Sequence, residues 1–274
     1  MRLLPVVLLL GVGCAHKPLS GRDLDRVIKP AFVSRIEDQA GPKSYVFRSD
    51  GSYGDKLKKL SEKEADRRLA VKLAGGSEDA EGNKKLTINR FQVADTLRSH
   101  TLSKLPKERP WTNTARPGDV AAALQSFLVE EVPANPPDYE LLRPLGVDAV
   151  VEFVVEEYGM RSEGGTAGCY VVGYGRMFML DGGGNIWYRS FRADQVDSKQ
   201  PHLDPFKVAK DTTLFREQMS QLLKAVADVF AQDLNPPDRR GGAPLKEGAQ
   251  EIREGEDTVQ PQKNKRPPEE EDPL

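Results

Sequence analysis

The densest run of apolar residues lies in the second half of the chain. Residues 147–158 read as a strand, and within them residues 150–155 are apolar at all but one position. Apolar residues on both faces indicate a central strand that is covered on both sides. Two more strand-like runs, 170–180 and 185–196, flank Asp181-Gly182-Gly183-Gly184. Glycines supply the positive φ angles of a tight turn, so this segment predicts an antiparallel hairpin.

The turn also predicts a register for this hairpin. Pairing Leu180 with Asn185 would place four aromatic side chains on one face of the sheet, namely Phe178 and Tyr174 opposite Trp187 and Phe191. Aromatic cross-strand pairs stabilise a sheet by about 0.2–1 kcal/mol each. We expect this aromatic face to pack against a helix.

Three glutamates lie on the central strand: Glu152, Glu156 and Glu157. The predicted register sets Arg176 opposite Arg189, which is unfavourable unless a carboxylate intervenes. Strand alternation puts Glu152 and Glu156 on one face, where either of them would balance these arginines. The alternative role, a carboxylate pair for hydrolysis, is a less direct explanation of the same residues.

Helical periodicity is present at several places. Ser61 and Glu64 form a capping box, and the apolar stripe that follows ends at Gly75-Gly76. After Pro117, apolar residues recur at helical spacing, and residues 138–145 read as a short helix closed by Gly146. A long closing helix is predicted before Asn235-Pro236, with one apolar face formed by Phe215, Met219, Leu222, Val226, Val229 and Phe230.

The first half of the chain is less regular. Residues 31–36 and 44–48 read as strands, whereas residues 86–105 fit either a strand or a helix. With the second half, these elements predict an α/β (α+β) fold. It would consist of a mainly antiparallel sheet with helices packed on it and a long closing helix.

The N-terminus has the features of an export signal. Met1-Arg2 is positive, and residues 3–12 form an apolar run that would be about 15 Å long as a helix, too short to span a bilayer. The following Gly13-Cys14-Ala15 resembles a bacterial lipobox, although Gly11 stands where that family usually has a large aliphatic residue. The resemblance implies a signal peptide over residues 1–13 and lipidation of Cys14. Ordinary cleavage after Ala15 and an uncleaved anchor are the alternatives.

A lipidated Cys14 would attach the protein to a membrane. Ala15, rather than Asp, follows the cysteine, and this resembles the signal for the outer membrane, facing the periplasm. Residues 14–23 then read as a lipidated tether and residues 24–234 as a single globular domain. From 235 to 274 apolar residues nearly vanish and prolines are frequent, which is typical of a disordered tail.

The amino-acid composition excludes several classes of protein. The 274 residues include 40 Lys and Arg against 42 Asp and Glu, a net charge of −2 that does not favour nucleic-acid binding. A hydrophobic fraction of 38% is too low for a polytopic membrane protein. Two cysteines do not make a disulfide scaffold. Cys169 lies in an apolar run, so we expect it to be buried rather than to act as a nucleophile or form an intermolecular disulfide.

The sequence contains no motif for a metal, a cofactor or catalysis. His16, His100 and His202 lack zinc-ligand spacing, and no Walker A, HExxH or GxSxG motif occurs. His202 is predicted to lie in a loop without a positioned nucleophile. Trp111 is flanked by turn residues, and we expect it in the core rather than at an exposed contact. We therefore assign no catalytic, cofactor-binding or metal-ligating residue.

Two motifs resemble those of a bacterial envelope superfamily. In residues 145–151 a helix would end at Leu-Gly before an apolar strand, and residues 179–187 carry a glycine-rich turn followed by Ile186-Trp187. The superfamily includes the curli-secretion lipoproteins and the lipoprotein activators of penicillin-binding proteins. The resemblance covers about 90 residues, from 147 to 234, and implies an α/β sheet with helices packed on it.

These observations favour a lipid-anchored envelope protein with a non-enzymatic binding, assembly or accessory role. Its partner would be another envelope protein or the cell wall. A periplasmic hydrolase acting on envelope polymers, and a lipoprotein component of an export machine, are the alternatives. A hydrolase should gather Glu152, His202 or Cys169 in a deep pocket, whereas a binding module should present an apolar surface patch.

Overall fold

The structure is a computed structural model that describes residues 16–57, 60–78, 82, 84–85, 87–124, 135–197 and 202–239. The predicted signal peptide and Cys14 lie outside these residues, as does most of the predicted tail. The chain divides into two units after Pro236, close to the predicted domain end at 234. Of the second unit, a short helix η4 (Pro237–Arg239) is described. No helix among the described residues is both long and apolar enough to cross a membrane.

The first unit contains a six-stranded, mostly antiparallel sheet in the order β1-β8-β7-β6-β2, and β3 also pairs with β6. The strands are β1 (His16–Lys17), β2 (Pro30–Ile36), β3 (Lys43–Tyr45), β6 (Ala149–Glu163), β7 (Thr166–Met179) and β8 (Asn185–Asp194). Both β2 and β3 run parallel to β6, one after the other along its edge. The predicted α/β fold and its hairpin are therefore confirmed, with a parallel edge added.

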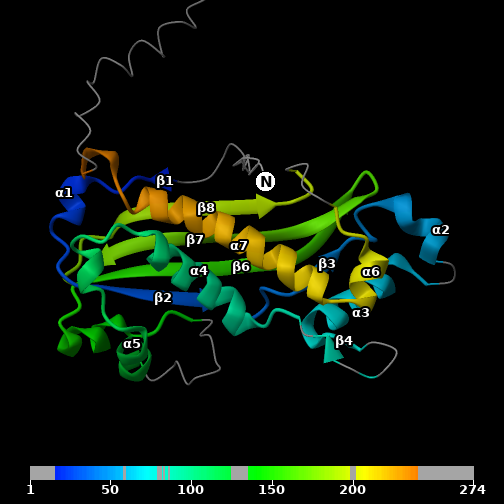
Figure 1. The fold of residues 1–274 in the computed structure, drawn as a ribbon, viewed down its shortest axis with the longest axis horizontal. Coiled ribbons are helices and arrows are strands. Elements are labelled where there is room, and N and C mark those ends of the chain that lie inside the picture. The colour runs from blue at the N-terminus through cyan, green and yellow to red at the C-terminus, as the bar shows by residue number, and fades with distance from the viewer. Residues whose placement is uncertain are drawn as a thin grey trace, which may run out of the picture. The chain divides into compact units, whose positions relative to one another are not determined.

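Helices α4 (Arg90–Lys104) and α7 (Thr213–Asp233) lie across one face of this sheet (Figure 1). The opposite face carries α5 (Pro117–Leu124) and the 3-10 helix η3 (Tyr139–Leu145) near β2. The remaining elements are α1 (Gly21–Leu24), η1 (Gly51–Tyr53), α2 (Gly54–Leu57), α3 (Glu62–Gly75), β4 (Ser77–Glu78), β5 (Lys84–Lys85), η2 (Trp111–Asn113) and α6 (Pro205–Lys210).

The local signals explain where several helices begin and end. The Ser61 hydroxyl accepts a hydrogen bond from the backbone N–H of Glu64 at the start of α3, and Gly76 follows its end at φ 82°. The ambiguous stretch 86–105 is helical from Arg90, because Asn89 and Gln92 form a reciprocal capping box. The short helix predicted over 138–145 is a 3-10 helix closed by Gly146 at φ 73°.

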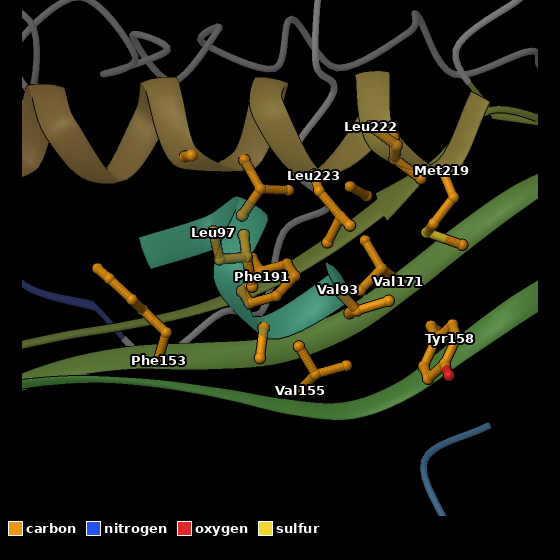
Figure 2. Close-up of a cluster of buried hydrophobic side chains, with 14 of the residues drawn as sticks. Val93, Leu97, Phe153, Val155, Tyr158, Val171, Phe191, Met219, Leu222 and Leu223 are labelled. Carbon is orange, nitrogen blue, oxygen red and sulfur yellow. The ribbon is translucent and has the colours of Figure 1, made fainter. Parts of the chain in front are cut away.

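The main core lies between the sheet and the two long helices (Figure 2). Phe153 and Val155 of β6 and Phe191 of β8 meet side chains of α4 and α7, including Leu97 and Leu223. Phe230 of α7 stacks on Phe153 at a centroid distance of 5.1 Å and meets Trp187 edge-on at 5.4 Å. The predicted apolar face of the closing helix is buried here, apart from the half-buried Val229. Trp111 is also in this core, edge-on to Phe32.

The central strand is buried on both sides, as its composition predicts. Val151 and Phe153 belong to the core under α4 and α7, whereas Val150 belongs to a smaller core with Val120 and Leu124 of α5. One predicted strand is shorter than expected. The strand of residues 44–48 ends at Tyr45, because the following backbone N–H groups of residues 46–48 donate to the buried carboxylate of Asp66 instead of a sheet partner.

The predicted hairpin register is wrong by one residue. Met177 pairs with Trp187 and Arg176 with Tyr188, and the register shifts between Met177 and Phe178, next to the turn. A one-residue shift moves side chains to the opposite face of the sheet. Trp187 and Phe191 therefore pack on α7, while Tyr174 and Phe178 point to the other face, and Arg176 is not opposite Arg189.

The tether expected over residues 14–23 is also different in the structure. From His16 the chain belongs to the fold, because β1 pairs with β8. Leu19 is 4% exposed and Leu24, in α1, is 1% exposed. The sequence suggested a tether because this segment contains Pro18, Ser20 and Gly21, yet Leu19 within it and Leu24 directly after it supply enough apolar surface to pack.

Candidate functional site

One face of the sheet is buried, and the other is partly exposed to solvent. In β7 the residues that face α7 are buried, whereas the alternate residues Val172, Tyr174, Arg176 and Phe178 are only half-buried. The small helices α5 and η3 cover one end of this second face, where Tyr139 packs on Phe178 at a centroid distance of 5.3 Å. We call the part formed by Tyr174, Arg176, Tyr188 and Ser190 the tyrosine face.

A buried carboxylate organises one end of this face. The Glu152 side chain is fully buried, and the Nε of Arg35 donates to its Oε1 at 2.5 Å. Arg176 Nε donates to the other carboxylate oxygen, and the Tyr139 hydroxyl also donates to Oε1. Two guanidinium groups and one phenol thus converge on a single carboxylate, and the geometry of all three donors is fixed by it.

The electrostatics of this cluster follow from its burial. Desolvation opposes the charge of Arg35, but the hydrogen bond and charge of Glu152 outweigh it and raise the pKa of Arg35. Burial, reinforced by the charge of Glu152, raises the pKa of Tyr139 well above its ordinary value. Tyr139 is therefore a neutral donor, and the cluster of two arginines and one glutamate carries one net positive charge.

Two tyrosines lie side by side beyond this cluster. The rings of Tyr174 on β7 and Tyr188 on β8 stack at a centroid distance of 5.5 Å and an interplanar angle of 26°. Arg35 Nη2 donates to the Tyr174 hydroxyl at 3.4 Å, so the buried cluster also positions this ring. The result is a pre-ordered aromatic surface with a guanidinium on its border.

A second ion cluster continues the same face away from η3. Lys43 Nζ and the Tyr170 hydroxyl each donate to a different oxygen of Glu157 at 2.7 Å. Farther along, Arg161 and Arg192 both bind the buried carboxylate of Asp194. Charges of both signs are therefore paired along this side of the sheet.

The residues that the sequence offered for catalysis are not brought together. Cys169 is buried under α7, with its Sγ 4.0 Å from the carbonyl oxygen of Phe215, and burial raises the pKa of its thiol. Its expected burial is confirmed. Glu152 lies on the opposite face of the sheet, and it balances Arg176, as expected, but not Arg189, which binds Asp233. His202 is exposed in a loop beside Asp197 and Glu163.

The other two histidines contact single carboxylates. His100 Nε2 on α4 is 3.0 Å from Asp228 of α7, and His16 Nε2 on β1 is 3.4 Å from Asp233. Both contacts join segments far apart in the sequence. They are contacts between packed elements, and neither involves the tyrosine face.

A hollow of about 480 Å³ lies where β3 meets the start of α3. Lys43, Arg48, Lys63 and Arg67 are among its lining residues, which at first suggests an anion site. However, Arg67 and Arg68 donate to Glu64 and lower its pKa to about 2, and Arg48 binds Asp66. The arginines of the hollow are therefore paired, which makes it a weaker candidate than the tyrosine face.

The sequence did not single out Arg35, Tyr139 or Tyr188. Arg35 and Tyr139 reach Glu152 from segments 117 and 13 residues away in the chain, respectively. The signal that identifies Tyr188 is its place next to Trp187, since neighbouring residues of a strand point to opposite faces. With Trp187 in the core, Tyr188 must point to the other side of the sheet.

Comparisons with known proteins identify no family for this chain. No family model and no curated protein matches the chain. A PelC variant dodecamer from Paraburkholderia phytofirmans is 12% identical, with 77% of this chain and 96% of that chain covered and a TM-score of 0.28. The hypothetical protein CT253 from Chlamydia trachomatis is 13% identical, with 75% and 98% covered and a TM-score of 0.24. Likeness at this level supports no statement about function.

Proposed function

We propose that the chain is a lipid-anchored envelope protein that binds another protein through the tyrosine face and performs no catalysis itself. The lipid anchor rests on the lipobox-like sequence that ends at Cys14. The binding role rests on the contrast between the two faces of β7, one buried and one half-exposed. This contrast is the single observation that carries the proposal.

The chemistry of the tyrosine face fits a protein partner. Tyrosine and arginine are enriched among residues that dominate binding energy at protein interfaces. Here Tyr174 and Arg176 are held by Glu152 and its partners before any partner arrives, so binding immobilises few additional side chains. The face presents rings and paired charges rather than the apolar patch expected from the sequence, and it therefore suits a partner with a mixed polar surface.

The hydrolase alternative has no comparable support. Cys169 and Glu152 lie on opposite faces of the sheet, and His202 lies in an exposed loop. A role in an export machine is compatible with the same binding face, and it differs only in the identity of the partner. Purification of the partner decides between these roles.

Site-specific photo-crosslinking in intact cells tests the proposal. A photoreactive residue at Tyr188 should give one dominant adduct, whereas the same residue at Lys224, exposed on α7, should give none. The captured protein is then purified and its affinity measured. Tyr188→Ala should weaken binding at least tenfold, which corresponds to about 1.4 kcal/mol, and Lys224→Ala should leave it unchanged.

Three results would contradict the proposal. Equal crosslinking from both positions would show that the tyrosine face is not selective. An adduct with twice the mass of the chain would identify a second copy as the occupant. Unchanged affinity of Tyr188→Ala would show that the captured protein binds elsewhere.

A further inference from the structure

The first strand brings the chain into the fold immediately after the proposed lipidation site. His16 pairs with Arg189 and Lys17 with Tyr188 on β8. Lys17 Nζ also donates to the carbonyl oxygen of Asn185, and His16 Nε2 is 3.4 Å from the Asp233 carboxylate. Leu19, two residues later, is 4% exposed. The position of His16 is thus fixed by backbone pairing, a side-chain contact and the burial that follows.

This position limits how far the domain can be from its anchor. From Cys14 to His16 the chain has two residue steps, which span at most about 7 Å even when fully extended. A lipidated Cys14 lies at the surface of the bilayer, since its acyl chains are buried in it. The part of the sheet edge where His16 pairs with Arg189 must then lie within about 7 Å of that surface.

We infer that the sheet edge formed by β1 and β8 rests against the lipid headgroups of the leaflet that holds the anchor. The partner of this surface is the bilayer itself. The inference rests on the proposed lipidation of Cys14, and it adds the orientation that a short connection imposes. A protein with a long tether would have no fixed orientation.

Covalent reach, rather than charge, determines this contact. The nearby α1 segment carries Arg22 and Arg26 but also Asp23 and Asp25, and Arg189 is paired with Asp233. These charges balance, and Lys17 adds one exposed positive charge at the edge, which gives only a weak attraction to anionic headgroups. The contact should therefore persist at high salt.

The orientation leaves the tyrosine face accessible. Strand β2 is at the far side of the sheet from β8, with β7 and β6 between them (Figure 1). Three strand spacings of about 4.8 Å place β2 roughly 14 Å farther from the bilayer. With one edge on the membrane, both faces of the sheet point sideways, and a partner can reach the tyrosine face along the membrane.

Headgroup quenching measures this orientation directly. The full-length lipidated protein is placed in vesicles of phosphatidylethanolamine and phosphatidylglycerol that carry a nitroxide on the headgroup. A fluorophore is attached at Arg192→Cys on β8 or, as the matched control, at Asp119→Cys on α5, which packs near β2; both residues are exposed. Cys169 is fully buried and should not react with the label.

We expect quenching at position 192 to be at least threefold stronger than at position 119, in low and in high salt. A third protein carries ten Gly and Ser residues inserted between Ala15 and His16. Such a linker reaches roughly 20 Å, so the difference between the two positions should disappear.

The outcomes separate this inference from the proposed function. Mass analysis of the N-terminal peptide first shows whether Cys14 carries lipid; an unlipidated protein overturns this inference and the lipid anchor of the proposed function. If the protein is lipidated but quenching is equal at both positions, or if the inserted linker changes nothing, only the inference is overturned. Crosslinking at Tyr188 remains an independent test of the binding role.

Discussion

The buried cluster around Glu152 leads to a quantitative prediction about the tyrosine face. Glu152→Gln keeps the shape of the side chain but removes its charge, so the guanidinium groups of Arg35 and Arg176 lose their counter-ion. The side chains of Glu152 and Arg35 are 0% and 5% exposed, so water cannot replace the lost interaction. Removing one partner of a buried ion pair costs about 3–5 kcal/mol.

That cost is large compared with the stability of a typical domain, about 5–15 kcal/mol. For a domain of this size it corresponds to a fall in Tm of roughly 6–20 °C. Circular dichroism during heating and urea unfolding would measure it. The control is Glu64→Gln on α3, which removes a carboxylate that also binds two arginines, but these arginines are 68% and 64% exposed. Exposed pairs contribute little, so the control should behave like the wild type.

A quadruple variant separates the charge effect from simple disruption. Replacing Arg35 by Met, Glu152 by Leu, Arg176 by Met and Tyr139 by Phe removes the cluster as a unit, because the Tyr139 hydroxyl also donates to Glu152. Apolar replacement of a complete buried ion cluster is often nearly neutral, so most of the stability should return. If Glu152→Gln is as mild as Glu64→Gln, the carboxylate does not hold this face together and the reasoning is refuted.

Other single substitutions test the two faces of the sheet and the loop that contains His202. Trp187→Ala should lower the free energy of unfolding by about 3–5 kcal/mol, because a fully buried ring is lost; a loss below 1 kcal/mol would contradict the packing. Gly175→Ala should cost about 1–3 kcal/mol, since the new Cβ would lie 2.4 Å from the Trp187 Cη2. Burial and the charge of Glu37 raise the pKa of Glu156, so its ionised form opposes folding. Glu156→Gln should therefore raise Tm at pH 7, and the difference should vanish as pH falls below about 4. His202→Ala should leave both Tm and partner affinity unchanged, because its side chain is exposed in a loop.

The elements predicted most accurately are those with strong local patterns. The central strand has a long apolar run, the closing helix has a sustained period, and the turn has three consecutive glycines; the structure contains all three. The stretch 86–105 was ambiguous because its apolar residues are sparse, although the capping pair Asn89 and Gln92 was a readable signal. The parallel strand β2 could be placed as a strand, but its partner is more than a hundred residues away in the chain.

The predicted register of the hairpin was wrong for a different physical reason. The turn length suggested a regular pairing, but a bulge between Met177 and Phe178 shifts it by one residue. Two glycines of β7 carry a further signal. The rings of Trp187 and Phe230 occupy the space that a side chain at Gly175 would need, and at Gly173 this space is taken by the carbonyl oxygen of Val154 and the ring of Phe191. Alternating glycines in a strand therefore indicated which face receives large rings from its neighbour.

In the observed register, adjacent residues of β8 lie on opposite faces of the sheet and have different roles. Trp187 points into the core beneath α7, and Tyr188 points to the half-open face, where it stacks on Tyr174. Loss of the Trp187 ring should therefore reduce stability, whereas loss of the Tyr188 ring should reduce binding while Tm stays near that of the wild type. Because the two side chains differ by one position in the same strand, such a separation cannot be attributed to a general disturbance of that strand. It would require that the two faces of the sheet have different roles.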